Sequence, residues 1–287
     1  MHNPAAETAS VSATASLQPL LQVDRLSLQY RSATAVVQAT REVSFDVHPA
    51  DRFVLLGPSG CGKSSLLKSV AGFLPPAAGE IRLEGRTVRQ PGPDRIVVFQ
   101  EFDQLPPWKT VLHNVMFPLL ASRTLGKREA AERARHYLDK VGLTRFADAY
   151  PHTLSGGMKA RVAIARALAM QPKMLLMDEP FAALDALTRR KMQEELLTLW
   201  DEVRFTLLFV THSIEEALVV GNRILLLSPH PGRVRAEINS HQYDLSSLGG
   251  AGFQQTAQRI HRLLFDEGGA AAAPERSINF SDVRFSY

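Results

Sequence analysis

The sequence predicts an α/β fold whose core is a mainly parallel sheet. Short apolar runs alternate with helical stretches along the chain, and this alternation is typical of parallel strands joined by right-handed crossovers. The runs 53–56 and 174–177 are apolar at every position, as expected for strands buried on both faces. A glycine-rich loop follows the first run and leads into a helical stretch, which is the arrangement of a phosphate-binding α/β domain.

The other elements follow from local patterns in chain order. Residues 21–30 alternate between apolar and polar, which indicates a strand with one buried face, and 42–47 is expected to be a second strand. The segment 81–83 precedes a Glu-Gly turn and is expected to be an antiparallel edge strand, so these three segments form an antiparallel β subdomain. Buried strands are also expected at 96–99, 206–210 and 224–227, and helices at 64–71, 188–203 and 214–220. The stretch 111–150 is helical and predicts a helical insertion in the sheet.

Length and composition favour one large domain with tails. The 287 residues suffice for a full α/β core. The expected organisation is a disordered tail over 1–16, the main domain over 17–240 with its helical insertion at about 101–165, a helical extension over 241–267, and a linker with a possible stub of a second domain over 268–287. No apolar stretch is long enough for a membrane-spanning helix, so any membrane role requires a partner protein.

Charge and cysteine content exclude several classes of function. Lys plus Arg number 33 against 29 Asp plus Glu, an excess of +4 with no polybasic run, so nucleic acid is not an expected partner. Cys61 is the only cysteine, which rules out a disulfide framework or a thiolate metal cluster within one chain. This composition fits a reducing cytosol.

The glycine-rich loop has the spacing of a phosphate loop. Its residues are Gly57, Pro58, Ser59, Gly60, Cys61, Gly62, Lys63 and Ser64. Its glycines let backbone N–H groups point at a polyphosphate. Lys63 is expected to reach the β- and γ-phosphates and Ser64 to bind Mg²⁺. Cys61 is expected to fill space, because no chemistry at this position needs a nucleophile.

Polar side chains follow two further strands of the expected sheet. Asp178 and Glu179 end one apolar strand, where α/β sheets hold their ligands. Asp178 is expected to hold Mg²⁺ through water and Glu179 to polarise the attacking water. His212 ends another strand and is expected to contact the γ-phosphate. Ser213 is expected to cap the next helix in a capping box completed by Glu216.

A second anion site is expected where a helix begins after Leu154. Ser155, Gly156 and Gly157 lie at the start of a strongly helical run, where backbone donors and the helix dipole favour an anion. One nucleotide does not need two such sites within one chain, so the segment is expected to serve a neighbouring subunit. The alternative is an ordinary capped helix start.

Together these motifs resemble those of the ATP-binding subunits of ABC transporters, over about residues 21–231. The resemblance implies a P-loop NTPase fold of the ABC type that hydrolyses ATP with Mg²⁺. By this resemblance, residues 57–65, which include Ser65, form the Walker A loop, and residues 154–158 form the signature motif. Gln100 is the Q-loop glutamine that touches Mg²⁺ and water.

The same resemblance assigns the polar residues at the strand ends. Asp178 is the Walker B aspartate, Glu179 is the catalytic base, Asp185 is the D-loop aspartate and His212 is the switch histidine. Tyr30 lies where this family stacks an aromatic ring on adenine. Met158 and Ala182 depart from the usual glutamine and serine, and neither change removes a phosphate contact.

The loop 104–108, with its two prolines and Trp108, resembles the importer branch for nitrate, taurine and sulfonates. The resemblance implies a homodimer of ATPase subunits, two transmembrane permease subunits and, indirectly, a periplasmic substrate-binding protein. It places the chain at the cytoplasmic face of the bacterial inner membrane and implies a small anionic nutrient as the transported substrate, with nitrate, a sulfonate, taurine, cyanate or a vitamin precursor all open.

The alternative is a soluble ABC ATPase that does not act in transport, or a remnant of a tandem ABC protein. The segment 278–287 repeats the apolar spacing of 21–30 and ends in the same tyrosine, after an Ala/Gly-rich stretch. It is either a chance amphipathic tail or the start of a second ABC domain.

Overall fold

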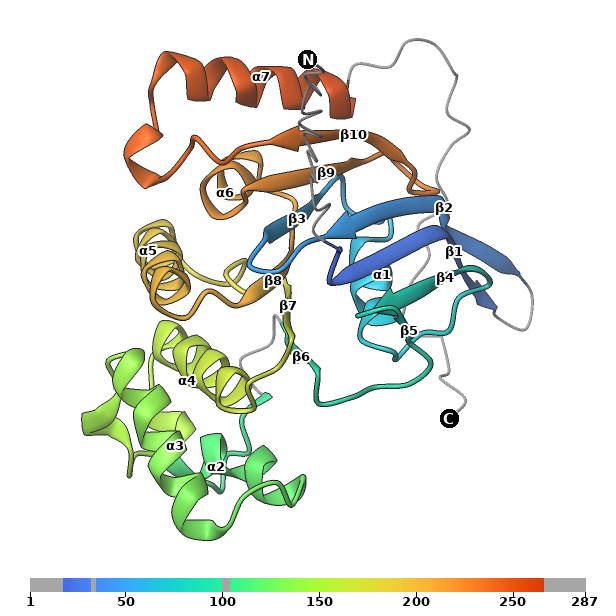
Figure 1. Ribbon diagram of the computed structural model, residues 1–287. Helices are drawn as coiled ribbons and strands as arrows, with labels where there is room; N and C mark the ends of the chain where they lie inside the picture. Colours follow the sequence, from blue (N-terminus) through green and yellow to red (C-terminus); the bar gives the residue numbers. More distant parts are fainter. Residues whose placement is uncertain (1–17, 32–34, 100–103, 266–287) are drawn as a thin grey trace, which may run out of the picture.

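The computed structural model of the protein describes residues 18–31, 35–99 and 104–265. Gln100 and the repeated segment 278–287 lie outside the described residues, so their expected roles stay predictions. Within the described ranges the chain forms two sheets flanked by helices (Figure 1).

The six-stranded sheet carries the core of the fold. Its order is β10-β9-β3-β8-β7-β6, and all neighbours are parallel except β9 and β10. Its strands are β3 (Arg52–Leu56), β6 (Arg95–Val98), β7 (Met174–Asp178), β8 (Thr206–Thr211), β9 (Arg223–Leu227) and β10 (Val234–Asn239). This confirms the mainly parallel sheet expected from the apolar runs.

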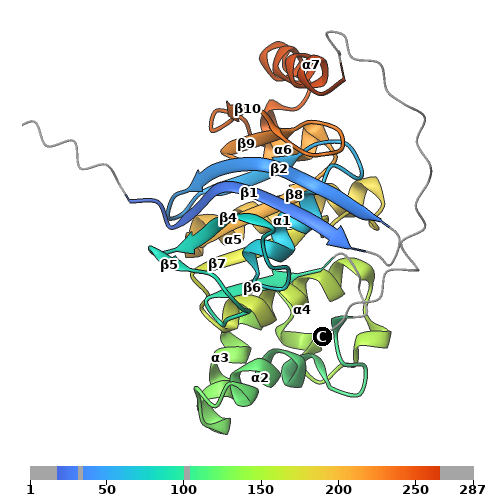
Figure 2. The ribbon, with the colours of Figure 1, turned by 90° about the vertical axis from the view of Figure 1, so that its right-hand side faces the viewer.

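The four-stranded sheet is antiparallel, with the order β2-β1-β4-β5. Its strands are β1 (Leu21–Arg31), β2 (Val36–Val47), β4 (Ala78–Leu83) and β5 (Arg86–Thr87). Figure 2 shows this sheet in front of α1 (Lys63–Val70). Leu66, Leu67 and Val70 of α1 fill the space between the two sheets.

The two faces of each central strand contribute to two different cores. Val54 and Leu56 of β3 pack with the helices on one face, while Phe53 and Leu55 pack with α1 and the antiparallel sheet on the other. The period of two residues along a strand produces this division. Burial of both faces explains why β3 is apolar throughout.

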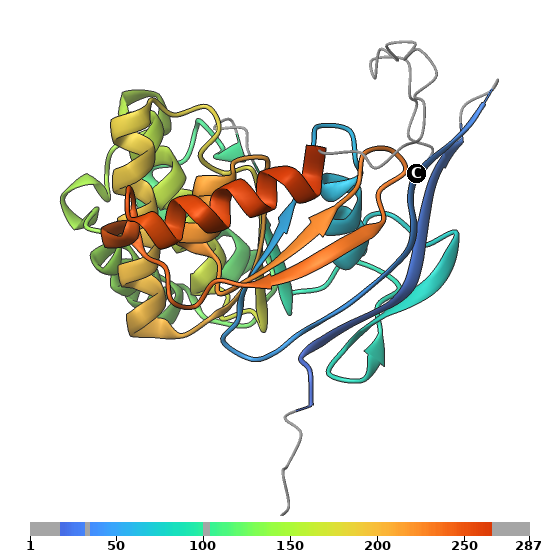
Figure 3. The ribbon, with the colours of Figure 1, turned by 90° about the horizontal axis from the view of Figure 1, so that it is seen from above.

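Within the described ranges six further α-helices either cover the six-stranded sheet or form a lobe beside it. They are α2 (Val111–Ala121), α3 (Lys127–Lys140), α4 (Gly156–Ala169), α5 (Ala186–Val203), α6 (Ile214–Val220) and α7 (Ala251–Phe265). In Figure 1 the helices α2, α3 and α4 form the lobe at the bottom, and Figure 3 shows α7 lying across the outer side of β9 and β10. None of the helices in the described ranges is long and apolar enough to cross a membrane.

Three local expectations were wrong. The strand β10 was missed, because only Ile238 of its six residues is buried and its pattern carries little signal. The segment 81–83 lies in β4, which is not an edge strand, because the two-residue β5 pairs with it on the outside. The strand β6 is an edge strand rather than a fully buried one, and Ile96 and Val97 are only partly buried.

Candidate functional site

The carboxyl ends of β3, β8 and β7 lie next to one another and form one edge of the six-stranded sheet, which we call the carboxyl edge. Leu56 pairs in register with Thr211, and Asp178 with Val210. Because the three strands are parallel, the residues that follow each of them emerge on the same side. The phosphate loop, the Asp178-Glu179 pair and His212 therefore share one site.

The phosphate loop connects β3 to α1 with backbone geometry that needs glycine. Gly62 caps α1 with φ 93°, and a Cβ there would lie 2.6 Å from the Thr40 side chain and 2.8 Å from the Ala39 carbonyl oxygen. Lys63 is only 4% exposed, and its Nζ donates to the carbonyl oxygens of Gly57 at 2.8 Å and Pro58 at 3.0 Å. The ammonium group is thus held inside the curve of the loop.

Cys61 packs in the core beside this loop. It is fully buried, and burial is the main cause that raises the pKa of its thiol. A neutral, buried thiol is a poor nucleophile. This arrangement agrees with the space-filling role expected for the side chain.

Ser64 and Asp178 meet across the carboxyl edge. The Ser64 hydroxyl donates to Asp178 Oδ1 at 2.8 Å. Burial is the main cause that raises the pKa of Asp178, while the hydrogen bond from Ser64 and the charges of Lys68 and Lys63 act in the opposite direction. A hydroxyl beside a desolvated carboxylate is a donor set that suits Mg²⁺, which would stabilise the charged form of Asp178. These two residues therefore fit the expected metal site.

Glu179 and His212 form the second pair at this edge. His212 Nδ1 lies 3.0 Å from Glu179 Oε2, within hydrogen-bonding distance. Glu179 has φ 45°, a left-handed conformation that is uncommon for a residue with a side chain. Its backbone is held there by the hydrogen bond from its N–H to the Val210 carbonyl at 3.0 Å. Strained backbone at a polar edge residue is typical of functional sites.

Tyr30 of β1 reaches the start of α1. Its hydroxyl lies 2.8 Å from Ser65 Oγ, so the ring stands beside the phosphate loop. The structure thus brings together the antiparallel sheet and the loop, as an aromatic contact to a bound base would require.

The signature segment and the D-loop aspartate, the two remaining predicted parts of the site, lie at the starts of α4 and α5. Ser155 caps α4 by accepting from the Met158 N–H at 3.3 Å, and Asp185 caps α5 by accepting from the Thr188 N–H at 3.0 Å. Hydrogen bonding by the Thr188 side chain and then by its backbone lowers the pKa of Asp185. A Cβ at Gly157 would lie 3.2 Å from Thr188 Cγ2, so these two helix starts are neighbours.

A buried polar cluster behind His212 was missed by the sequence analysis. It consists of Thr211, Glu216 and Gln193, which are 2%, 7% and 7% exposed. Ser213 does accept from the Glu216 N–H at 3.3 Å, but the Glu216 carboxylate turns to Thr211 and Gln193 instead of returning to the Ser213 backbone. The expected capping box is therefore only half formed, because Glu216 satisfies its oxygens better inside the protein.

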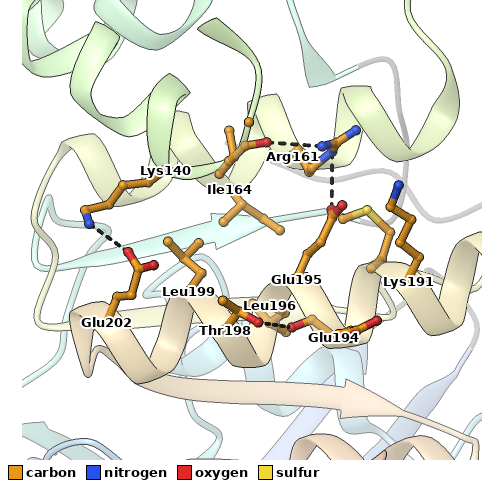
Figure 4. Close-up of a pocket in the computed structure, with 13 residues that line it drawn as sticks. Lys140, Arg161, Ile164, Lys191, Glu194, Glu195, Leu196, Thr198, Leu199 and Glu202 are labelled. Atoms are coloured by element: carbon orange, nitrogen blue, oxygen red, sulfur yellow. Dashed lines mark hydrogen bonds and ion pairs between the residues drawn. The ribbon is translucent and has the colours of Figure 1, made fainter.

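A separate groove lies between α5 and the lobe formed by α3 and α4, and encloses about 380 Å³ (Figure 4). Lys140 Nζ pairs with Glu202 Oε2 at 2.8 Å, and Arg161 Nε lies 3.4 Å from Glu195 Oε2. One guanidinium nitrogen of Arg161 also donates to the Val141 carbonyl at 3.1 Å. The groove contains none of the residues of the carboxyl edge.

Comparison with known sequences places the chain in one family. The model of the ABC transporter family matches residues 40–182. The taurine import ATP-binding protein TauB of Rhizobium johnstonii is 51% identical over 221 residues, covering 77% of this chain and 84% of that protein. The nitrate import ATP-binding protein NrtD of Synechococcus elongatus is 43% identical over 207 residues, covering 72% and 75%.

Solved structures give the same result. The dimeric ATP-binding cassette MJ0796, in a post-hydrolysis state bound to ADP and Pi, matches with a TM-score of 0.66 and 32% identity, over 76% of this chain and 98% of that one. The protein cbiO1 of Clostridium perfringens, part of an ABC transporter complex, matches with a TM-score of 0.71 and 26% identity, over 85% and 97%. The family and fold expected from the motifs are confirmed: the chain belongs to the ABC transporter family, as one of its ATP-binding, ATP-hydrolysing subunits.

Proposed function

We propose that this ATPase powers a bacterial importer of a small anionic nutrient. The observation that carries the proposal is the pairing of Ser64 with Asp178 and of Glu179 with His212 at one sheet edge, in a chain 51% identical to a taurine import ATP-binding protein. The nitrate import relative adds nitrate to the candidate substrates, and the motif resemblance adds other sulfonates. The subunit works at the cytoplasmic face of the inner membrane, on two permease subunits served by a periplasmic binding protein.

The chemistry is assigned residue by residue. The phosphate loop, with Ser59, Gly60 and Ser65, wraps the phosphates, and Lys63 moves its ammonium from the loop carbonyls to the β- and γ-phosphates. Ser64 and Asp178 hold Mg²⁺, with Gln100 added from the family pattern. The metal ion supplies positive charge that offsets the phosphate oxygens.

Glu179 accepts the proton of the attacking water at a carboxylate oxygen. His212 holds the other side of that carboxylate through its 3.0 Å contact, and so fixes the direction in which Glu179 faces the water. The strained backbone of Glu179 contributes to the same fixed position. Both residues act on the γ-phosphate, while Tyr30 supports the base of the nucleotide.

The active form is a homodimer with two shared ATP sites. At the start of α4, Ser155 accepts from the Met158 N–H and Gly157 lies beside Thr188 of α5, whereas Lys63 donates to Gly57 and Pro58 of its own loop. A helix start with free backbone donors has a use if it faces the ATP held by a second copy. The dimeric form of the solved relative supports this arrangement.

The surface around Trp108 is proposed to contact the permease subunits. Trp108 is 75% exposed, yet its loop is anchored. Arg166 of α4 donates to the Gln104 carbonyl at 2.7 Å, and Asn114 of α2 donates to the carbonyls of Pro106 at 3.2 Å and Lys109 at 3.0 Å. A rigid loop that presents an exposed indole is typical of a protein contact.

Growth and uptake of a deletion strain test the proposal. The strain is grown with taurine, an aliphatic sulfonate or nitrate as the single sulfur or nitrogen source, and uptake of each labelled anion is measured. Complementation by the wild-type chain should restore one of these uptakes, and Glu179→Gln should not. Normal uptake of all three anions without this chain would overturn the anionic substrate class. A chain that hydrolyses ATP yet never co-purifies with a permease would instead support the non-transport alternative.

A further inference from the structure

His212 stands at an exposed end of β8. Its side chain is 54% exposed and lies within hydrogen-bonding distance of Glu179. A mobile imidazole would not hold Glu179 in one direction, so the backbone beneath it has to be fixed from the protein side. The residues directly behind it, in the buried polar cluster of Thr211, Glu216 and Gln193, provide that support.

Thr211 connects the cluster to the backbone of the His212 turn. Its hydroxyl donates to Glu216 Oε2, and the same oxygen accepts from the Ser213 N–H at 3.0 Å. The hydroxyl hydrogen and its oxygen are therefore both used. Because Thr211 and Ser213 flank His212, this one side chain constrains the residues on either side of the imidazole.

Glu216 and Gln193 complete the cluster from two other helices. Glu216 Oε1 accepts from Gln193 Nε2 at 3.0 Å, so each carboxylate oxygen has a donor. No Lys or Arg in the described ranges forms an ion pair with this buried carboxylate. A buried carboxylate without a cation is costly, and an apolar side chain would fill the same space without that cost. An apolar residue could not accept the hydrogen bonds from Thr211 and Gln193, so these bonds are the reason for a carboxylate at position 216.

We propose that Glu216 is a positioning residue for ATP hydrolysis, which acts with Gln193 through Thr211 to fix His212 against Glu179. Gln193 lies on α5, whose first residue follows Asp185, so the cluster also joins the D-loop helix to the histidine turn. The inference rests on the proposed roles of His212 and Glu179. The test of this inference differs from a test of those two roles, because the variants used leave both His212 and Glu179 in place.

The sharpest experiment compares two buried threonines of the same strand. Thr206 lies at the other end of β8, is 4% exposed, and accepts from the Ala50 N–H at 3.0 Å. Thr211→Val and Thr206→Val therefore remove the same atom from equally buried positions. ATPase turnover of the full-length dimer should fall about ten- to a hundredfold in Thr211→Val, with KM for ATP within about twofold of wild type. Thr206→Val should also lose thermal stability, though less than Thr211→Val because it breaks one described hydrogen bond instead of two, and should keep its kcat; Thr211→Ser should recover most of the turnover.

A second pair of variants tests the carboxylate itself. Glu216→Gln keeps an acceptor for Thr211, and a rotated Gln193 amide can accept from the new amide, so kcat should stay within about threefold. Glu216→Met has a similar size but leaves both donors without an acceptor, so kcat should fall by about tenfold or more. Equal kcat in Glu216→Met and wild type, or equal losses in Thr206→Val and Thr211→Val, would overturn the proposal. If Thr211→Val does not fold, the Glu216 pair decides alone.

Discussion

The carboxyl edge and the groove beside α5 both contain charged side chains, but they hold them in different ways. At the carboxyl edge Ser64 meets Asp178 at 2.8 Å, and in the buried polar cluster behind His212 both carboxylate oxygens of Glu216 have donors. In the groove Arg161 and Glu195 approach only to 3.4 Å, with 21% and 30% of their side chains exposed. One region is fixed by directional hydrogen bonds, and the other is joined by partly exposed ion pairs, of which the Arg161–Glu195 pair forms no hydrogen bond between its buried atoms.

This difference matches what each region has to do. Hydrolysis requires Glu179 and His212 at set positions, and positions are fixed by buried, fully satisfied hydrogen bonds. Partly exposed ion pairs contribute only about 0–1 kcal/mol each, so they can break and re-form when α3 and α4 shift against α5. If the proposed function holds, the helices on either side of the groove shift against each other when ATP closes the dimer. The residues of the carboxyl edge keep their positions.

The largest expected effect is at the carboxyl edge. Glu179→Gln should lower ATP turnover about a hundred- to ten-thousandfold, because it removes the general base. ATP affinity should stay within about threefold, since the phosphate loop is intact. Steady-state hydrolysis and calorimetric ATP binding with Mg²⁺ measure the two effects. Turnover near the wild-type rate would show that another group is the base.

Lys63→Ala should act on binding rather than on the chemical step. The ammonium makes charge-assisted contacts to phosphate that are each about 1.5–3 kcal/mol, so ATP affinity should fall at least about tenfold. Lys173→Ala is a matched control, because Lys173 pairs with Glu84 at the surface and its side chain is 56% exposed. Calorimetry should show no change in the control. Unchanged affinity in Lys63→Ala itself would contradict the loop assignment.

A mixture of two inactive variants tests whether the edge is completed by a second copy. Ser155→Arg should bind ATP through its own Lys63 but prevent closure, and Lys63→Ala should fail to bind. In a mixed dimer one site carries both lesions and the other carries neither. Equal amounts should therefore regain about a quarter of wild-type hydrolysis, since about half of the dimers are mixed and have one intact site. No recovery, with mixed dimers shown by cross-linking, would leave Ser155 as an ordinary helix cap.

Much of the edge could be predicted from the sequence, because its parts are local. The phosphate loop follows β3, Asp178 ends β7 and His212 follows β8, and parallel strands bring their carboxyl ends together without further information. The partners of Glu216 could not be predicted, since Gln193 meets it only after α5 and α6 have packed. The strand β10 was missed for a similar reason: its stability comes from pairing with β9, not from its own pattern.

The smallest expected effect is in the groove. Arg161→Met removes the donor to the Val141 carbonyl and the partner of Glu195, while the methionine still covers the apolar wall formed by Ile164. We expect a loss of about 1 kcal/mol in the free energy of unfolding, or a melting temperature about 2 to 4 °C lower. Basal ATP hydrolysis should stay within about twofold, because no residue of the carboxyl edge is touched.

Lys140→Met provides the control for this change. It removes the other ion pair of the groove, but Lys140 also lies at the surface and bonds to no backbone carbonyl in the described structure. The melting temperature of the Lys140→Met variant should therefore fall less than that of the Arg161→Met variant. If Arg161→Met instead lowers hydrolysis as much as Thr211→Val does, the groove holds the carboxyl edge in place as well. The separation between a fixed edge and a yielding boundary would then be wrong, because both regions would belong to one rigid unit.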